Sequence, residues 1–188
     1  MFVTSVITNQ VAKLKSGQLN HIKIGNINSF KDWSHVKDII KGYMKLGRDG
    51  KSGDVYNQGS MRTNSVLTYI LLSLEAAGYN INLMETFNND KKVVYPTEID
   101  KTTIFGVKFE KTKIDRIMLL EGLEYTLKDK GIILHTDKGI VKIEFDPERF
   151  RPAEVPIMLS DTTKIQNIGF KMEYSLQNII NDQLNYFV

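Results

Sequence analysis

Arg62 is one of several residues in this 188-residue sequence that could do chemistry. It lies in the segment 58–64, just before a helix that Ser65 is expected to start. The first turn of a helix has unpaired backbone N–H groups and a partial positive charge, so an anion could meet both these groups and the guanidinium. The alternative is an arginine that is simply solvated in a loop.

His35 and Asp38 have the residue types of a catalytic acid–base pair. Their spacing of three on a predicted helix favours a structural role instead, in which they fix a turn. No metal site is expected, because the chain has no cysteine and His21 and His135 are far apart in sequence. Four acidic residues could supply a carboxylate pair for glycosidic chemistry, but nothing in their spacing requires it and solvated faces explain them better: Glu110, Asp115, Glu121 and Glu124.

The composition, 41% hydrophobic and 25% charged, is typical of a globular protein. The lack of cysteine excludes disulfides and thiol catalysis and fits a cytoplasmic location. No apolar run approaches the roughly 20 residues that cross a bilayer, so no membrane association is expected. The net charge of +3 could suit an anionic ligand, but the lysines are dispersed and nucleic acid is not an expected partner.

Hydrophobic periodicity and capping residues predict the helices that would position these residues: 5–16, Ser34 to Gly47, Val66 to Ala77, 162–168 and 176–187. Short strands are expected over 21–24 and 54–57. The segment 82–142 is β-rich, with strand-like pieces at 92–95, 103–107 and 131–135 and a hairpin turn at 137–139. We expect one α/β or α+β domain over residues 1–188, with a β-rich insertion at about 82–142.

Three segments together carry a family resemblance. The first is Phe2-Val3-Thr4 followed by Lys31-Asp32-Trp33-Ser34-His35. The second runs from Gly53-Asp54-Val55-Tyr56-Asn57 to Ser65, and the third is Phe150-Arg151-Pro152-Ala153-Glu154-Val155 with the following Ser160-Asp161. They resemble the carboxy-terminal half of GDP-mannose 4,6-dehydratases and related reductases, which are extended short-chain dehydrogenase/reductases.

The resemblance implies a small substrate-binding domain whose Rossmann half is absent. In the complete enzyme it implies oxidation at C4 of the sugar, loss of water across C5 and C6, and return of hydride at C6 by NAD(P). No glycine-rich turn that leads from a strand into a helix, as a dinucleotide site requires, and no Tyr-x-x-x-Lys pair of the superfamily type occurs here. We therefore expect no cofactor on this chain, no catalytic residue, and a nucleotide-diphosphate sugar as its ligand.

The resemblance also implies roles for individual residues. Arg151 would contact the diphosphate or the nearby ribose, and Lys31 would approach the phosphates. A surface arginine held by Glu154 is the alternative for Arg151. Glu154 would either orient Arg151 or bind a ribose hydroxyl. Val3 and Thr4 would touch the sugar nucleotide, and Arg62 joins the predicted site on its own grounds.

Other functions remain open from the sequence. Within the family, a reductase or epimerase could use the same substrate clamp. A different class is the docking subunit of a split enzyme, which would bind a separate Rossmann-domain chain, or a stand-alone binding or regulatory module. A third possibility is a degenerate remnant of the family that binds no ligand. Separately, hairpins of the β-rich segment could form contacts in a homo-oligomer.

Overall fold

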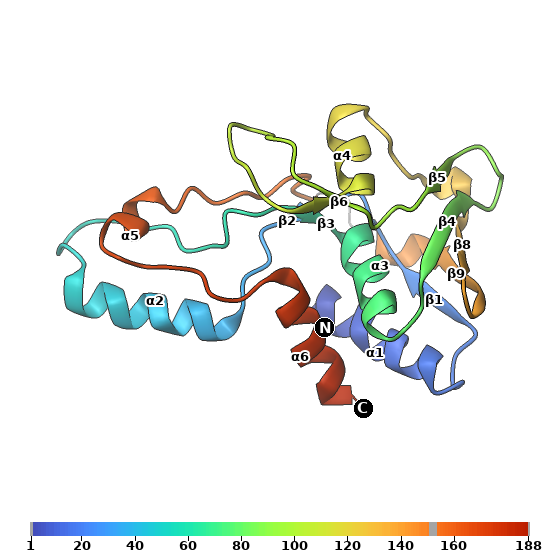
Figure 1. Cartoon of the computed structure of the whole chain (residues 1–188), viewed down its shortest axis with the longest axis horizontal. Helices are drawn as coiled ribbons and strands as arrows, with labels where there is room; N and C mark the ends of the chain where they lie inside the picture. The colour runs from blue at the N-terminus through green and yellow to red at the C-terminus, as the bar shows by residue number, and fades with distance from the viewer. Residues whose placement is uncertain (1, 151–153, 188) are drawn as a thin grey trace.

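A computed structural model describes residues 2–150 and 154–187 and shows a mixed α/β fold (Figure 1). The main sheet has the strand order β1-β9-β8-β4-β5. Its central hairpin joins β8 (Gly131–Thr136) to β9 (Gly139–Phe145), and β1 (His21–Ile24) runs parallel to β9. β4 (Ile81–Thr86) and β5 (Lys92–Val94) complete it in antiparallel pairs, so the β-rich segment shares one sheet with β1.

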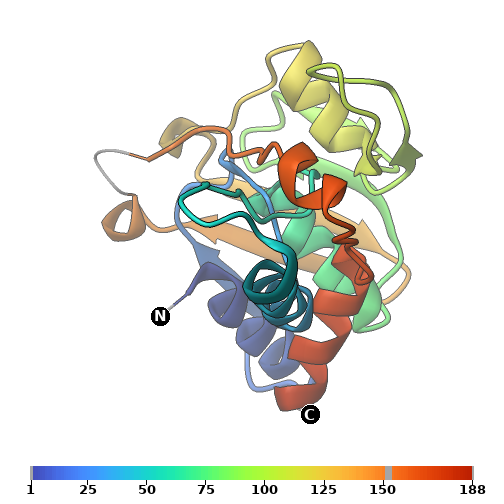
Figure 2. The same ribbon diagram turned by 90° about the vertical axis from the view of Figure 1, so that its left-hand side faces the viewer.

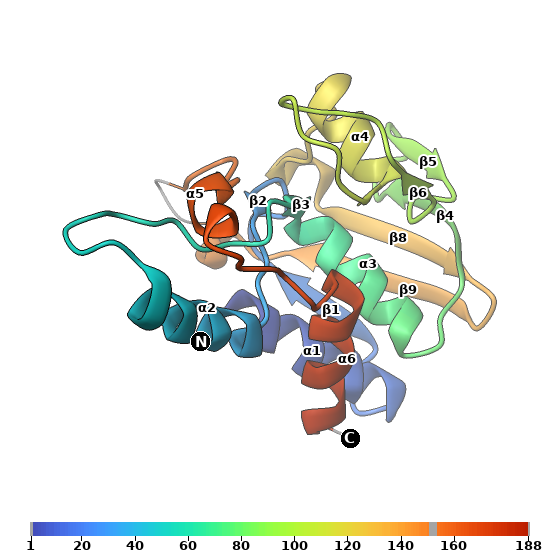
Figure 3. The same cartoon turned by 60° about the vertical axis from the view of Figure 1, so that its left-hand side comes forward.

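Three helices pack against one another beside this sheet (Figure 3): α1 (Val3–Lys15), α3 (Val66–Ala76) and α6 (Leu176–Phe187). α3 is apolar almost all round, which is why it is buried at their centre. The core joins the helices to the sheet through side chains that are fully buried, among them Ile7, Leu67, Ile70, Ile132 and Ile143. Each such side chain contributes about 1.5–3 kcal/mol relative to an exposed one.

A second group of elements lies apart from the sheet (Figure 1). α2 (Val36–Asp49) and the short α5 (Thr163–Asn167) are connected to the rest by extended segments and by the two-stranded pair β2 (Phe30–Lys31) and β3 (Asn64–Ser65). The remaining elements belong to the β-rich segment and its continuation, where α4 forms a projection above the sheet (Figure 2). They are β6 (Ile99–Asp100), β7 (Lys111–Thr112), α4 (Lys113–Leu120) and the 3-10 turns η1 (Leu127–Asp129) and η2 (Pro147–Arg149).

The predictions for the strongly periodic helices are confirmed, including the cap at Ser65, whose side chain accepts from the Thr68 N–H. The hairpin turn at 137–139 and the strand 21–24 are also confirmed. The predicted cap of α2 is wrong by one residue, since His35 and not Ser34 caps the helix. The helix also continues past Gly47 to Asp49, because a glycine inside a helix costs only about 1 kcal/mol relative to alanine.

Two predicted strands do not form. Residues 103–107 make only an isolated bridge between Ile104 and Val107, around residues with positive φ at Phe105 and Gly106. Residues 54–57 are in no strand, because no other described segment pairs with them. None of the helices in the described part of the chain has the length and hydropathy needed to cross a membrane.

Candidate functional site

Part of each of the three segments singled out in the sequence lies at or next to β2. On one side, β2 pairs with β3 in antiparallel register. On the other, the Phe30 N–H donates to the Pro156 carbonyl at 2.7 Å and the Met158 N–H donates to the Phe30 carbonyl at 2.9 Å. The segment that follows residue 153 therefore runs alongside β2, although more than 120 residues separate them.

One carboxylate joins these segments just beyond β2. Asp32 Oδ1 accepts from the N–H of Ser60 at 2.7 Å and from its hydroxyl at 2.5 Å. Asp32 Oδ2 accepts from the N–H of Ser160 at 3.2 Å and from its hydroxyl. We call these three residues the Asp32 clasp. These four hydrogen bonds to one carboxylate hold the three loops together, since hydrogen bonds to ionised groups are the strong ones.

Gly59 permits this close approach, which makes it a test of the clasp. A Cβ at Gly59 would lie 1.9 Å from Ser160 Oγ and 2.7 Å from Asp32 Oδ2. Gly59→Ala is therefore expected to destabilise the protein by about 1–3 kcal/mol in urea unfolding. Gly47→Ala is the matched control, because nothing lies within 4 Å of its Cβ, and it should be neutral or stabilising. Equal stability of the two variants would contradict the clasp.

A groove of about 730 Å³ opens beside the clasp. Its walls are one side of α2, the segment 56–59 and the segment 157–161. Aromatic rings of Tyr43 and Tyr56 and the polar groups of Asp32 and Ser160 all line it. Its volume lies in the range of small-molecule sites.

Two predicted site residues, Lys31 in β2 and Glu154 in the segment alongside it, lie close together. Lys31 Nζ is 3.5 Å from Glu154 Oε1 and donates to the Val155 carbonyl at 2.9 Å. Glu154 Oε2 accepts from Asn26 Nδ2 at 3.0 Å. About a fifth of each charged side chain is exposed, at 20% and 23%. Arg151 lies outside the described residues, three positions before Glu154.

The other predicted site residues lie elsewhere. Arg62 is half-buried and donates to the Tyr174 carbonyl at 2.8 Å, and burial lowers the pKa of its guanidinium against the raising effect of Asp32. Thr4 accepts from Gln183 Nε2 at 3.2 Å, so its hydroxyl links α1 to α6. Val3 packs against the core. Among the described residues, no hydrogen bond or ion pair joins these side chains to Lys31 or Glu154.

His35 and Asp38 attach α2 to α6 and to the segment that precedes α6. His35 Nδ1 accepts from the Lys37 N–H, its Nε2 lies 3.0 Å from Asp182 Oδ2, and its ring stacks on Tyr174. Asp38 is fully buried and accepts from the backbone N–H groups of Glu173 and Tyr174. Their partners give them a structural role.

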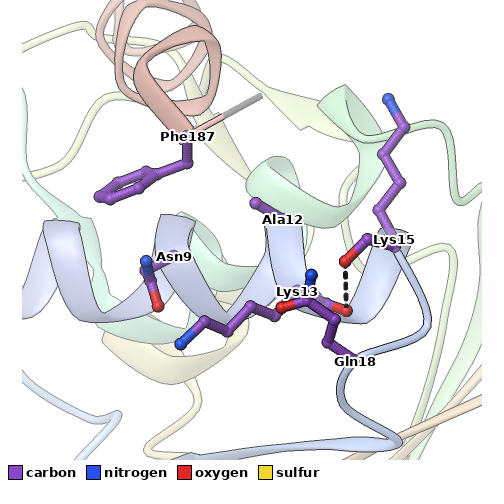
Figure 4. Close-up of a pocket in the computed structure, with 7 residues that line it drawn as sticks. Asn9, Ala12, Lys13, Lys15, Gln18 and Phe187 are labelled. Carbon is purple, nitrogen blue, oxygen red and sulfur yellow. Dashed lines mark hydrogen bonds between the residues drawn. The ribbon is translucent and has the colours of Figure 1, made fainter.

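A second hollow of about 440 Å³ lies between α1 and the end of α6 (Figure 4). Lys13, Lys15 and Phe187 line it, and none of the predicted site residues does. Within the ranges 2–150 and 154–187, no three His, Asp or Glu side chains cluster as metal ligands would.

The strand-to-helix junction between β3 and α3 has no glycine-rich turn that could bind a dinucleotide. Its residues are Asn64, Ser65 and Val66, without glycine. The Ser65 side chain caps α3 and its N–H donates to Asp115, so these groups are already paired. This junction thus does not fit the pyrophosphate of NAD(P).

Sequence reasoning missed the clasp and the role of Asn26. Asp32, Ser60 and Ser160 all lie within the segments that carried the resemblance, but their mutual contact spans 28 and 128 residues. No local pattern signals such a contact. The one available signal was Gly59, a glycine in a loop beside a serine, where close backbone approach is common.

Comparisons of the sequence with known proteins point to one family. A family model described as GDP-mannose 4,6 dehydratase matches residues 1–183. GDP-mannose 4,6-dehydratases from Sinorhizobium fredii and Drosophila melanogaster are 25% and 26% identical over 98% and 97% of the chain, which covers 42% and 36% of their lengths. A GDP-6-deoxy-D-mannose reductase from Pseudomonas aeruginosa is 28% identical over 85 residues. The chain thus spans about two fifths of the dehydratases, at their carboxy-terminal part.

Solved structures show the same fold. RMD from Pseudomonas aeruginosa, complexed with NADPH, has a TM-score of 0.62 at 17% identity, and the match covers 99% of this chain and 42% of that one. UDP-glucose 4-epimerase from Bifidobacterium longum, complexed with NAD+ and UDP, has a TM-score of 0.52 at 17% identity. The match covers 96% of this chain and 38% of the epimerase.

Proposed function

Because the chain belongs to the GDP-mannose 4,6 dehydratase family, we propose that it is the nucleotide-sugar-binding portion of an NAD(P)-dependent sugar 4,6-dehydratase. It holds a GDP-mannose-like ligand and is not catalytically complete alone. The observation that carries this proposal is that parts of the three family-like segments meet at β2, where Lys31 lies beside Glu154.

The arrangement around Lys31 suits a diphosphate. An ammonium group has three donors, of which one reaches the Val155 carbonyl and one faces Glu154, so one is left for a phosphate oxygen. Glu154 and Asn26 fix the position of the ammonium group. Arg151 would add a planar fork that can bind one phosphate through two hydrogen bonds.

The residues of this chain would bind and orient the nucleotide sugar. The dinucleotide and the proton-transfer groups would be held by residues outside it, in the part that the relatives possess beyond the matched region. A reductase with the same clamp is the second candidate, since the Pseudomonas aeruginosa reductase is 28% identical over 45% of the chain.

Lys31→Ala tests the diphosphate contact. Loss of a charge-assisted hydrogen bond, worth about 1.5–3 kcal/mol, should weaken GDP-mannose binding about 10- to 100-fold in calorimetric titrations. Lys31→Arg should bind GDP-mannose at least as tightly as the wild type. Lys13→Ala is the matched control, because it removes the same charge from the hollow at α1. If Lys13→Ala and Lys31→Ala weakened GDP-mannose binding equally, the effect would be one of net charge. That result would contradict the assignment of Lys31 to the diphosphate.

A further inference from the structure

The β-rich segment is tied to the loop 25–29, which connects β1 to β2. Asn28 Nδ2 donates to the Tyr125 carbonyl at 2.6 Å, and the Tyr125 N–H donates to Asn28 Oδ1 at 2.9 Å. The two residues are 97 positions apart in the sequence. Because both hydrogen bonds of the amide go to the backbone of one residue, they fix the orientation of the Asn28 side chain as well as its position.

Tyr125 is itself held in place from within the β-rich segment. Its side chain is buried, and the N–H of the next residue, Thr126, donates to Asp129 Oδ2 at 2.7 Å. The same oxygen accepts from Lys91 Nζ at 2.6 Å, and this ammonium group lies 5.5 Å from the centre of the Tyr125 ring. Lys91 belongs to the turn between β4 and β5, so these contacts anchor Tyr125 to the main sheet.

The loop 25–29 connects Asn28 to the residues predicted to bind the diphosphate. The Asn28 N–H donates to Asn26 Oδ1 at 2.9 Å. Asn26 Nδ2 donates to Glu154 Oε2 at 3.0 Å, and Glu154 Oε1 lies 3.5 Å from Lys31 Nζ. A continuous series of polar contacts therefore leads from the β-rich segment to the ammonium group of Lys31.

The remaining contacts of the loop fix its path but not the side chain of Asn26. The Leu67 N–H donates to the Ile27 carbonyl at 3.2 Å, and the Val66 N–H donates to the Ser29 carbonyl at 3.0 Å. Among the described residues, the Asn26 amide has hydrogen-bond partners only in Asn28 and Glu154. The orientation of Asn26 therefore depends on how Asn28 is held.

We propose that Asn28 is a positioning residue for the nucleotide-sugar site, through which the β-rich segment holds Asn26, Glu154 and Lys31 in place before the ligand binds. This inference rests on the proposed function. Side chains that are already ordered in the free protein lose less conformational freedom when a ligand binds, and the affinity is higher for that reason. The β-rich segment thereby contributes to binding without contacting the diphosphate.

Asn28→Ala tests this role by calorimetric titration of GDP-mannose into the full 188-residue chain. Affinity should fall about tenfold, because the contacts that hold Lys31 are then free to rearrange. In a Lys31→Ala background the same substitution should cost less than about twofold, because effects that act through one network are not additive.

Asn80→Ala is the matched control for the loss of an asparagine amide. Asn80 Nδ2 also joins two distant parts of the chain, since it donates to Asp137 Oδ2 at 2.7 Å. Among the described residues, no hydrogen bond links it to a predicted site residue. The affinity of this variant for GDP-mannose should equal that of the wild type.

Asp129→Ala is a second variant, and it acts from within the β-rich segment. It removes the acceptor of the Thr126 N–H and leaves Asn28 intact. It also raises the net charge by one, which alone would favour an anionic ligand. Affinity for GDP-mannose should nevertheless fall about threefold or more, so the direction of the change separates the effect of position from that of charge.

Three results would overturn the inference while the wild type still binds GDP-mannose and the proposed function stands. The first is equal affinity in Asn28→Ala and the wild type. The second is tighter binding in Asp129→Ala. The third is an undiminished loss from Asn28→Ala in the Lys31→Ala background, which would show that Asn28 does not act through Lys31. A wild-type chain that binds no GDP-mannose would instead overturn the proposed function, and this inference with it.

Discussion

Asp115→Ala is expected to lower the free energy of unfolding by about 3–5 kcal/mol, since it removes a fully buried carboxylate and leaves its donors unpaired. Asp115 accepts from Asn64 Nδ2 and from the Ser65 N–H, each at 3.0 Å. Burial raises the pKa of Asp115, while the hydrogen bonds from Ser65 and Asn64 act to lower it. The carboxylate thereby fixes α4 to the start of α3.

Urea unfolding followed by circular dichroism measures this loss. Asp115→Asn keeps the shape of the side chain and one hydrogen-bond acceptor. Its loss of stability should therefore be smaller than that of the alanine variant. Asp54→Ala, an exposed aspartate paired only with Lys164, is the control and should change stability by no more than about 0.5 kcal/mol. A loss below about 1 kcal/mol in Asp115→Ala would show that the buried network does not hold α4.

Asp32→Ala is expected to cost about 2–4 kcal/mol and to weaken GDP-mannose binding about tenfold or more. The substitution leaves the N–H groups of Ser60 and Ser160 without their acceptor, which is the expensive part of losing a hydrogen bond. The segment 154–160 would then be held to β2 only by its backbone hydrogen bonds and by the contacts of Lys31 with Glu154 and Val155, among the described residues. Glu154, which positions Lys31, lies at the start of that segment.

The two effects are separable. Unfolding curves give the stability of Asp32→Ala, and calorimetry below its transition gives the binding of GDP-mannose. Asp115→Ala serves as the control for binding, because among the described residues Asp115 makes no hydrogen bond with the Asp32 clasp, and binding should persist where that variant remains folded. Unchanged GDP-mannose affinity in folded Asp32→Ala would show that the clasp does not organise the site.

Capping residues and hydrophobic spacing predicted the helices whose formation depends on neighbouring residues in the sequence. Ser65 predicted the start of α3 because its hydroxyl satisfies a free N–H, and the spacing of Ile7 and Val11 predicted α1 because those positions share a helix face. α4 was missed, although Thr112 caps it, because it is short and lies among strand-like residues.

Pairing partners could not be predicted in the same way. Residues 54–57 have the composition of a strand, but a strand also needs a neighbour, and no described segment provides one. The parallel pairing of β1 with β9 joins residues about 120 apart, and no local pattern signals it. The same holds for Lys31 and Glu154, which the family resemblance named separately and only the fold brings together.

The most direct test of the account is calorimetric titration of GDP-mannose into the 188-residue chain, with UDP-glucose and Arg151→Ala as comparisons. The account predicts micromolar binding that prefers the guanine nucleotide and is lost in Arg151→Ala. No binding of GDP-mannose at millimolar concentration would contradict the claim that this chain holds the nucleotide sugar.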